Sequence, residues 1–299
     1  MNPKIRHFLL ALAASMLMSG SLQAADKLPV TTSFSILEDL VRVVGADRVT
    51  VTSLVGPDED AHVFEPRPAD AKSLLKSRLL LLNGLGFEPW AQKLAHSANY
   101  KGETLIASKS VKARSMADDK GHTEVDPHAW QNPENVVLYV RDIAATLSKL
   151  DPAGAATFQN NSEAYIKELH ALDEWAKTQF ASIATDKRKV ITSHDAFAYF
   201  AAHYQIKFMA PQGLSTDAEP SAKTIALLIR QIKREKIKAL FLENMSNPKL
   251  LAQLGKDTGA TTGSRLYADA LSGTDQPGAT YLKMMHHNVT QLVSGMKLN

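Results

Sequence analysis

DPAGAATFQNNSEAYIKELHALDEWAKTQFASI, residues 151–183, is the stretch that decides the architecture of this chain. Asp151-Pro152 has the form of a helix N-cap followed by proline at the first helical position. At ~1.5 Å per residue, a helix over this range would be about 45 Å long, a rigid strut unlike a glycine-rich hinge. We therefore predict a linking helix over residues 151–184. Apolar residues recur along it at the spacing of one helical face, and they are Phe158, Tyr165, Leu169, Leu172, Ala176 and Phe180.

Before this helix, strand-like and helix-like segments alternate, a pattern typical of a parallel sheet flanked by helices. The first predicted helix opens with Ser35-Ile36-Leu37-Glu38, which has the S-x-x-E spacing of a capping box. Residues 25–150 are therefore predicted to form an N-terminal lobe. The predicted strands cover residues 28–32, 49–55, 79–82 and 104–107, and the predicted helices cover 35–45, 68–77, 88–96 and 132–150.

After the linking helix the same alternation returns, although the two sets share no sequence identity that we can see. Residues 185–299 are predicted to form a C-terminal lobe. The predicted fold class is α/β, with two lobes, each a four-stranded mostly parallel sheet flanked by helices, joined by one long backbone helix. The second set has predicted strands at 190–193, 206–210, 239–243 and 264–268, and predicted helices at 196–204, 219–233, 248–258 and 278–296.

Residues 1–24 have the features of a secretory signal peptide. Lys4 and Arg6 give a basic start, and the apolar run 8–18 is too short to span a bilayer. Leu22-Gln23-Ala24 resembles a small-residue cleavage site. The short apolar run disfavours the alternative, an uncleaved membrane anchor. We expect export to the periplasm.

Composition narrows the classes of partner and ligand. The sequence contains no cysteine, so we expect no lipid attachment through an N-terminal Cys, and a metal must be held by nitrogen and oxygen. Removing Lys4 and Arg6 lowers the formal net charge from +3 by two, to +1. That balance gives no case for nucleic acid or anionic lipid as partner. About 275 residues remain, which is ample for two domains with separate cores.

Four short segments each present a side chain that binds metals in proteins. His62, His128, His194 and Asp269 would together supply three imidazoles and one carboxylate, a complete set of ligands for a transition metal. The segments are Asp60-Ala61-His62-Val63-Phe64-Glu65-Pro66, Asp126-Pro127-His128-Ala129-Trp130, Thr192-Ser193-His194-Asp195 and Tyr267-Ala268-Asp269-Ala270-Leu271.

The predicted positions of these side chains converge. His62, His194 and Asp269 each follow a predicted strand, and His128 precedes a predicted helix. Ligands of open α/β sheets bind beyond the carboxyl ends of strands. Because two residues come from each lobe, the predicted site lies in the cleft between the lobes. Taken singly, each histidine has the alternative of a solvated loop side chain, and Asp269 that of a helix N-cap.

The other histidines are weaker candidates. His96, His170 and His203 lie on predicted helices. The pair His286-His287 is also helical, and adjacent helical residues point about 100° apart.

With these segments the chain resembles the metal-binding solute-binding proteins of bacterial ABC importers, the zinc and manganese group often called cluster A-I. The resemblance covers the mature chain end to end, and its DPHxW-type and SHxAF-type segments are the most specific. The matching segments are Gly56-Pro57, Asp60-Ala61-His62, Phe64-Glu65-Pro66, Asn83-Gly84-Leu85-Gly86-Phe87-Glu88, Asp126-Pro127-His128-Ala129-Trp130, Ser193-His194-Asp195-Ala196-Phe197, Glu243-Asn244 and Tyr267-Ala268-Asp269.

The resemblance implies a metal held between the lobes by His62, His128, His194 and Asp269, with delivery to a membrane permease. Zinc members of the family often carry a long loop rich in histidine and acidic residues before the second histidine. The matching segment here, 116–125, is short. A disordered, solvated loop is the favoured interpretation of it. The alternative is a weak transient metal site, and its candidate ligands are Asp118, Asp119, His122 and Glu124.

Zinc is favoured over manganese as cargo. Three neutral nitrogens and one carboxylate suit tetrahedral zinc, whereas manganese prefers more oxygen ligands. The resemblance implies the same, because manganese specialists of the family tend to have Glu where this chain has His194. A bidentate Asp269 would also satisfy manganese, so manganese stays an alternative.

The second class of function considered is a secreted zinc-dependent hydrolase. A catalytic zinc keeps one open position, whereas four protein ligands close the site, and the chain has no HExxH helix motif. Glu65, Asp195 and Glu243 are candidate bases, but they are better suited to orienting ligands or capping helices. We therefore expect a binding protein and no enzyme. One cleft per chain is typical of a monomer.

Overall fold

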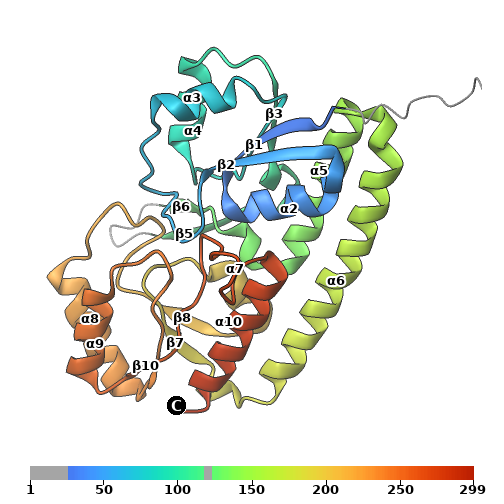
Figure 1. Ribbon diagram of the computed structural model, residues 1–299. Helices are drawn as coiled ribbons and strands as arrows, with labels where there is room; N and C mark the ends of the chain where they lie inside the picture. The colour runs from blue at the N-terminus through green and yellow to red at the C-terminus, as the bar shows by residue number, and fades with distance from the viewer. Residues whose placement is uncertain (1–25, 118–122) are drawn as a thin grey trace, which may run out of the picture.

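The computed structural model describes residues 26–117 and 123–299. The predicted signal peptide and the middle of the 116–125 segment lie outside the described residues. Two four-stranded sheets form two halves, and helix α6 (Ala155–Ala181) runs along one side of both (Figure 1). This arrangement confirms the predicted α/β fold with two parallel sheets and a long helix.

The N-terminal half is built on a sheet with strand order β2-β1-β3-β4, in which all neighbours are parallel. All four leucines of β3 are buried, as expected for a parallel strand covered on both faces. The strands are β1 (Leu28–Phe34), β2 (Val49–Val55), β3 (Leu79–Leu82) and β4 (Glu103–Ile106). The helices are α2 (Ser35–Gly45), α3 (Pro68–Leu74), α4 (Pro89–Ser97) and α5 (Pro133–Leu150).

The C-terminal half repeats this topology with shorter strands. Its sheet has the order β10-β9-β7-β8, again all parallel, so in both sheets the first strand of the set lies between the second and the third. This confirms the predicted repeat in topology. The strands are β7 (Lys189–Ile191), β8 (Lys207–Met209), β9 (Ala239–Leu240) and β10 (Thr261–Thr262). The helices are α7 (Ala198–Tyr204), α8 (Ala222–Glu235), α9 (Pro248–Thr258) and α10 (Tyr281–Met296).

The predicted last strand, 264–268, is wrong. The strand at this edge is β10, and Leu266 makes only an isolated bridge with Glu243. Side chains take the hydrogen bonds that a neighbouring strand would otherwise make. The Asn288 side chain of α10 binds both the N–H and the carbonyl of Tyr267, at 3.0 and 2.7 Å.

Two predicted helix starts are also wrong in detail. Residues Pro152–Gly154 form a 3-10 turn before α6, and Asp151 does not cap it, because its carboxylate accepts hydrogen bonds from Arg48 at 2.7 and 3.0 Å. Ser35 is already the first residue of α2, and no side chain caps that helix. The Ser35 hydroxyl instead accepts a hydrogen bond from the N–H of Leu271 in the other half, at 2.9 Å.

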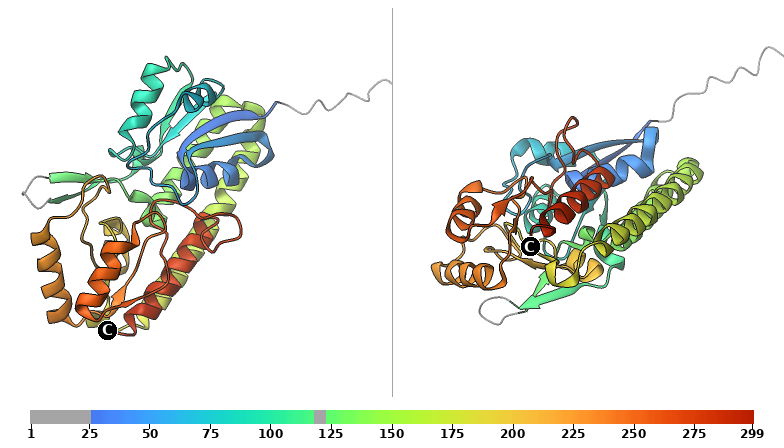
Figure 2. Two further views of the ribbon diagram at one scale, coloured as in Figure 1. Left: turned by 60° about the vertical axis from the view of Figure 1, so that its left-hand side comes forward. Right: turned by 90° about the horizontal axis from the view of Figure 1, so that it is seen from below.

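The 116–125 segment is not wholly the solvated loop that the sequence favoured. Strands β5 (Arg114–Ala117) and β6 (Thr123–Asp126) pair antiparallel in a hairpin (Figure 2). The hairpin extends outward at the level where the two halves meet, and β6 leads directly into His128. Of the candidate ligands for a weak site here, only Glu124 is among the described residues.

The larger of two apolar clusters in the described chain spans both halves, and a smaller one, which includes Ile191, Leu228 and Leu251, lies within the C-terminal half. One cluster of buried side chains runs from Leu28 of β1, through Phe158 and Phe180 of α6, to Met296 of α10. The six apolar residues predicted for one face of α6 are all buried. Packing of α2, α5 and α10 against α6 joins the two halves through the larger cluster. Among the described helices, none is both long enough and apolar enough to cross a membrane.

Candidate metal centre

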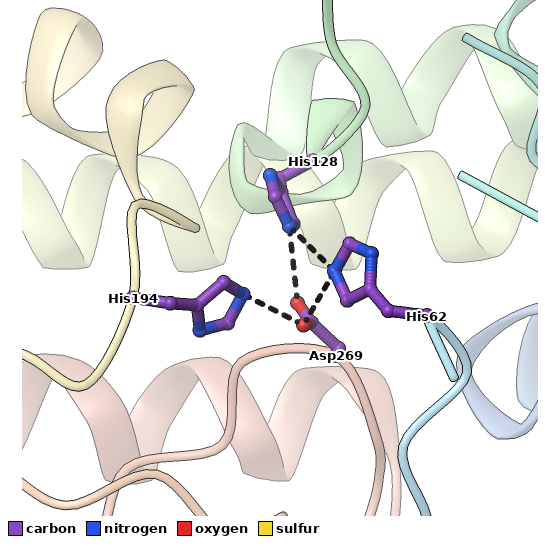
Figure 3. A group of neighbouring side chains, drawn as sticks. All are labelled: His62, His128, His194 and Asp269. Atoms are coloured by element: carbon purple, nitrogen blue, oxygen red, sulfur yellow. Dashed lines mark hydrogen bonds and ion pairs between the residues drawn. The ribbon is translucent and has the colours of Figure 1, made fainter. Parts of the chain in front are cut away.

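The structure brings together His62, His128, His194 and Asp269, which the sequence predicted as neighbours (Figure 3). His62 lies in the loop between β2 and α3, and His128 follows β6. His194 follows β7, and Asp269 lies beyond the bridge at Leu266. One ligand atom from each residue lies within 4.8 Å of the others.

The three imidazoles all direct Nε2 toward the carboxylate. Nε2 of His194 and Nε2 of His62 lie 2.9 and 3.3 Å from Oδ2 of Asp269, and Nε2 of His128 lies 3.7 Å from Oδ1. The Nε2 atoms of His62 and His128 are 3.3 Å apart. Figure 3 shows the three imidazoles arranged around the carboxylate of Asp269.

Two buried carboxylates orient two of the imidazoles from behind. Asp126 Oδ1 lies 2.8 Å from Nδ1 of His128, and Glu243 Oε2 is in close contact with Nδ1 of His194. A carboxylate at Nδ1 holds the proton there and leaves the lone pair of Nε2 free for a cation. Sequence reasoning named Glu243 as an orienting residue but missed Asp126 in this role. The available signal is the Asp-x-His spacing, which also occurs at Asp60 and His62.

Burial and charge act in opposite directions on the side chains of the cluster. Burial lowers the pKa of His194, but the charges of Glu243 and Asp269 raise it well above its ordinary value. For His128 burial prevails, and the pKa is lowered. Burial raises the pKa of Asp269, but the His194 and His128 charges lower it well below its ordinary value. Asp269 is thus held as a carboxylate.

Several polar atoms of the cluster lack a hydrogen bond. Both oxygens of Asp269 and Nε2 of His194 are buried without a regular hydrogen-bond partner among the described residues. Leaving buried polar atoms unsatisfied costs about 1–3 kcal/mol each. A divalent cation among these atoms would satisfy all of them, so the donor set fits such an ion.

The surroundings of the cluster are largely apolar. The ring of Phe87 meets His62 edge-on at 4.7 Å, and the ring of Trp130 lies 5.3 Å from His128. The side chains of His128, His194 and Asp269 are fully buried. Water is therefore excluded from these three side chains, which strengthens the electrostatic interactions among them.

The other candidates of the sequence stand apart from this cluster. Within residues 26–117 and 123–299, no second group of three or more histidine and carboxylate side chains converges. Glu65 is exposed and Asp195 is half-buried. His203 binds Asp173 at 2.6 Å, and His286 packs on Trp175.

Comparison with known proteins indicates the class of protein to which this fold and site belong. The chain is 29% identical over 290 residues to the metal ABC transporter substrate-binding lipoprotein ScbA of Streptococcus cristatus, covering 95% of this chain and 94% of that protein. It is 30% identical over 278 residues to the manganese-binding lipoprotein MntA of Halalkalibacterium halodurans, covering 93% and 91%. The solved periplasmic zinc-binding protein TroA of Treponema pallidum superposes with a TM-score of 0.85 at 26% identity, covering 90% and 99%.

The fold and the converging donors therefore define a metal-binding substrate-binding protein of an ABC transporter, and no enzyme. The hydrolase alternative finds no support among these relatives. Residues 30–295 match the family model described as zinc-uptake complex component A, periplasmic. The chain belongs to this family, ZnuA.

Proposed function

We propose that His62, His128, His194 and Asp269 bind one divalent metal ion as transported cargo, and that the preferred ion is zinc. The observation that carries the proposal is the convergence of three Nε2 atoms and one carboxylate within 4.8 Å. Four protein ligands complete a tetrahedral zinc shell. A closed shell suits carriage better than catalysis, because it leaves no position for a reacting water.

Manganese is the second candidate cargo. Relatives with both kinds of name exist, a manganese-binding lipoprotein and a zinc-binding TroA. Three nitrogens favour zinc, since manganese prefers oxygen ligands, but a bidentate Asp269 would make the site acceptable to manganese. Zinc also binds more tightly than manganese at most nitrogen sites, so the physiological cargo has to be measured in the cell of origin.

We further propose that the protein works as a monomer in the periplasm and delivers the ion to the membrane permease of an ABC importer. The predicted organisation is a signal peptide at 1–24, lobes at 25–150 and 185–299, and the linking helix at 151–184. Support for delivery comes from the relatives, whose names place them with ABC transporters. Support for a cleft site comes from the ligands themselves, because two come from each half.

Calorimetric titration of the metal-free protein tests the site. One tight zinc event per chain is expected, and zinc should raise the melting temperature because it binds only the folded state. His62→Ala should remove most of that rise, whereas His96→Ala, at an exposed histidine of α4, should keep it. The assignment is wrong if both variants respond like the natural protein. Metal analysis of protein purified from its own periplasm, without added metal, identifies the cargo.

A further inference from the structure

His62 differs from the other three side chains of the cluster in how it is held. It alone keeps some exposure to solvent, while His128, His194 and Asp269 are fully buried. In the described part of the chain, no carboxylate contacts its Nδ1. Its loop, between β2 and α3, has no regular secondary structure. No carboxylate of the described chain orients this imidazole through Nδ1, so contacts made by the surrounding loop must position it.

The comparison of two Asp-x-His segments shows where that positioning comes from. In both segments the aspartate accepts a hydrogen bond from the backbone N–H of the histidine, at 3.0 Å for Asp126 and 2.9 Å for Asp60. The same oxygen of Asp126 also contacts Nδ1 of the His128 ring. Asp60 instead directs its second oxygen to the other half, where the hydroxyl of Thr216 donates to it at 2.7 Å.

Two further hydrogen bonds tie the same loop to the C-terminal half, and one of them runs from the N–H of Asp58 to the carbonyl of Leu271, at 2.8 Å. The Asn244 side chain donates to Asp58 Oδ1 at 2.8 Å, and it also donates to the carbonyl of Ala270, at 3.2 Å. Asn244 follows Glu243, and Ala270 follows Asp269. The Asp58 contact therefore joins the His62 loop to the segments that carry the opposite side of the cluster. We name Asp58, Asp60, Thr216 and Asn244 the clasp.

Packing around the clasp is sparse, so these polar contacts have little competition. One cavity, of about 670 Å³, is lined by His62, Leu214 and Ser215 among others. Another, of about 390 Å³, is lined by Asp60 and Thr216 among others. The segment of Thr216 thus lies between two cavities, and His62 lines the larger of these two.

We propose that the clasp residues are positioning residues that hold His62 over the bound metal and set the rate at which the metal leaves. Release requires one ligand to leave first, and His62 is the ligand of the four that keeps some exposure to solvent. When the clasp is closed, the loop cannot retreat without breaking hydrogen bonds to Asp58 and Asp60. This proposal rests on the proposed metal-binding function.

The test is stopped-flow release of zinc from the loaded protein into excess chelator. Thr216→Val removes the hydroxyl with little change of shape. Asp58→Gly removes the other carboxylate without strain, because Asp58 has φ 57° and glycine tolerates that conformation. Each variant should release zinc about tenfold faster, as expected for losing one hydrogen bond to a charged group. Association should change by less than about twofold, since interface changes act mostly on dissociation.

Conservative variants and a matched control separate positioning from general destabilisation. Thr216→Ser and Asp58→Asn retain the hydrogen-bonding groups and should restore slow release. Thr178→Val is the matched control, because Thr178 donates only within α6, to the carbonyl of Glu174. The melting temperature of the metal-free protein should fall by no more than about 2–4 °C in any variant, the shift expected for losing one hydrogen bond in a chain of this size.

Three outcomes overturn the proposal of the clasp. Release within about twofold of the natural rate in both variants shows that the clasp does not limit dissociation. A fall in metal-free melting temperature larger than about 4 °C together with slower association shows a merely structural role. Failure of Thr216→Ser to restore slow release shows the same. A natural protein that binds neither zinc nor manganese refutes the proposed function itself, and calorimetric titration with both metals detects that failure beforehand.

Discussion

Replacing Glu243 by glutamine should weaken zinc binding by reversing the hydrogen bond behind His194. Oε1 of Glu243 accepts the backbone N–H groups of Ser193 and His194, at 2.8 and 3.2 Å, and Oε2 faces Nδ1 of His194. In the variant, the amide oxygen must stay with the two N–H donors. The amide NH2 then faces Nδ1, which has to become the acceptor. The proton moves to Nε2 and blocks the lone pair that should bind the metal.

The magnitude follows from which contacts survive. Both backbone hydrogen bonds are kept, so the fold loses little and the effect falls on the ligand. Loss of such an outer partner of a metal-binding histidine typically costs 10–100-fold in affinity, which corresponds to about 1.4–2.8 kcal/mol. We expect Glu243→Gln to lose zinc affinity in this range, with a smaller change in the melting temperature of the metal-free protein.

Competition titration of zinc against a chelator of known affinity measures this loss. Glu65→Gln is the matched control, since Glu65 is an exposed carboxylate on the His62 loop and should leave the affinity unchanged. Circular dichroism and melting establish that Glu243→Gln is folded. Affinity within twofold of the natural protein in a folded variant would refute the reasoning, because His194 would then not depend on Glu243 for its tautomer.

Three further predictions concern charge. Burial lowers the pKa of His194, but the charges of Glu243 and Asp269 raise it well above its ordinary value, so zinc must displace a proton from this imidazole. Zinc binding should therefore release about one proton at neutral pH and weaken as the pH falls. Calorimetry in buffers of different ionisation enthalpy measures the proton release, and a binding enthalpy that does not depend on the buffer would contradict the prediction. His194→Glu replaces a nitrogen ligand by a carboxylate and should move the ratio of zinc to manganese affinity toward manganese. Competitive titration of the two metals measures this ratio, and an unchanged ratio would contradict the assignment of His194 as a ligand. Burial raises the pKa of Asp173, but hydrogen bonds from His203 and other donors lower it to about 2. The contribution of the Asp173 carboxylate to folding stability should therefore be fully present above its ordinary pKa, near ~3.9, and should be lost as the pH falls through about 2. Asp173→Asn should cost about 3 kcal/mol in denaturant unfolding at neutral pH, and Glu174→Gln, at a side chain that is 73% exposed, should cost under about 0.5 kcal/mol.

Much of the fold was predictable because local and global signals agree. Val49–Val55, Leu79–Leu82 and Pro248–Thr258 have the predicted bounds, since β-branched runs, a fully apolar run and a proline start are strong local signals. The convergence of the four candidate ligands was predictable for a related reason. Parallel strands end at one edge, so side chains that follow such strands meet there. That these side chains bind the metal stays a prediction.

The features that were missed depend on contacts distant in sequence. Ser35 has the spacing of a capping box, but its hydroxyl binds Leu271, a partner that no local pattern reveals. The 264–268 segment looks like a strand, but Asn288 supplies the hydrogen bonds to Tyr267. Thr216 and Asp60 likewise meet only in the folded chain.

The apolar cluster that spans both halves limits how the chain can be divided into independently folding units. The ends of α6, near residues 150 and 185, separate the two sheets in the sequence, but they do not interrupt the apolar packing. Helices α2 and α5 of the N-terminal half and helix α10 of the C-terminal half all pack against α6. A fragment cut at either point would expose Phe158 or Phe180 and the partners that pack on them. We therefore expect neither half to fold as a stable unit on its own.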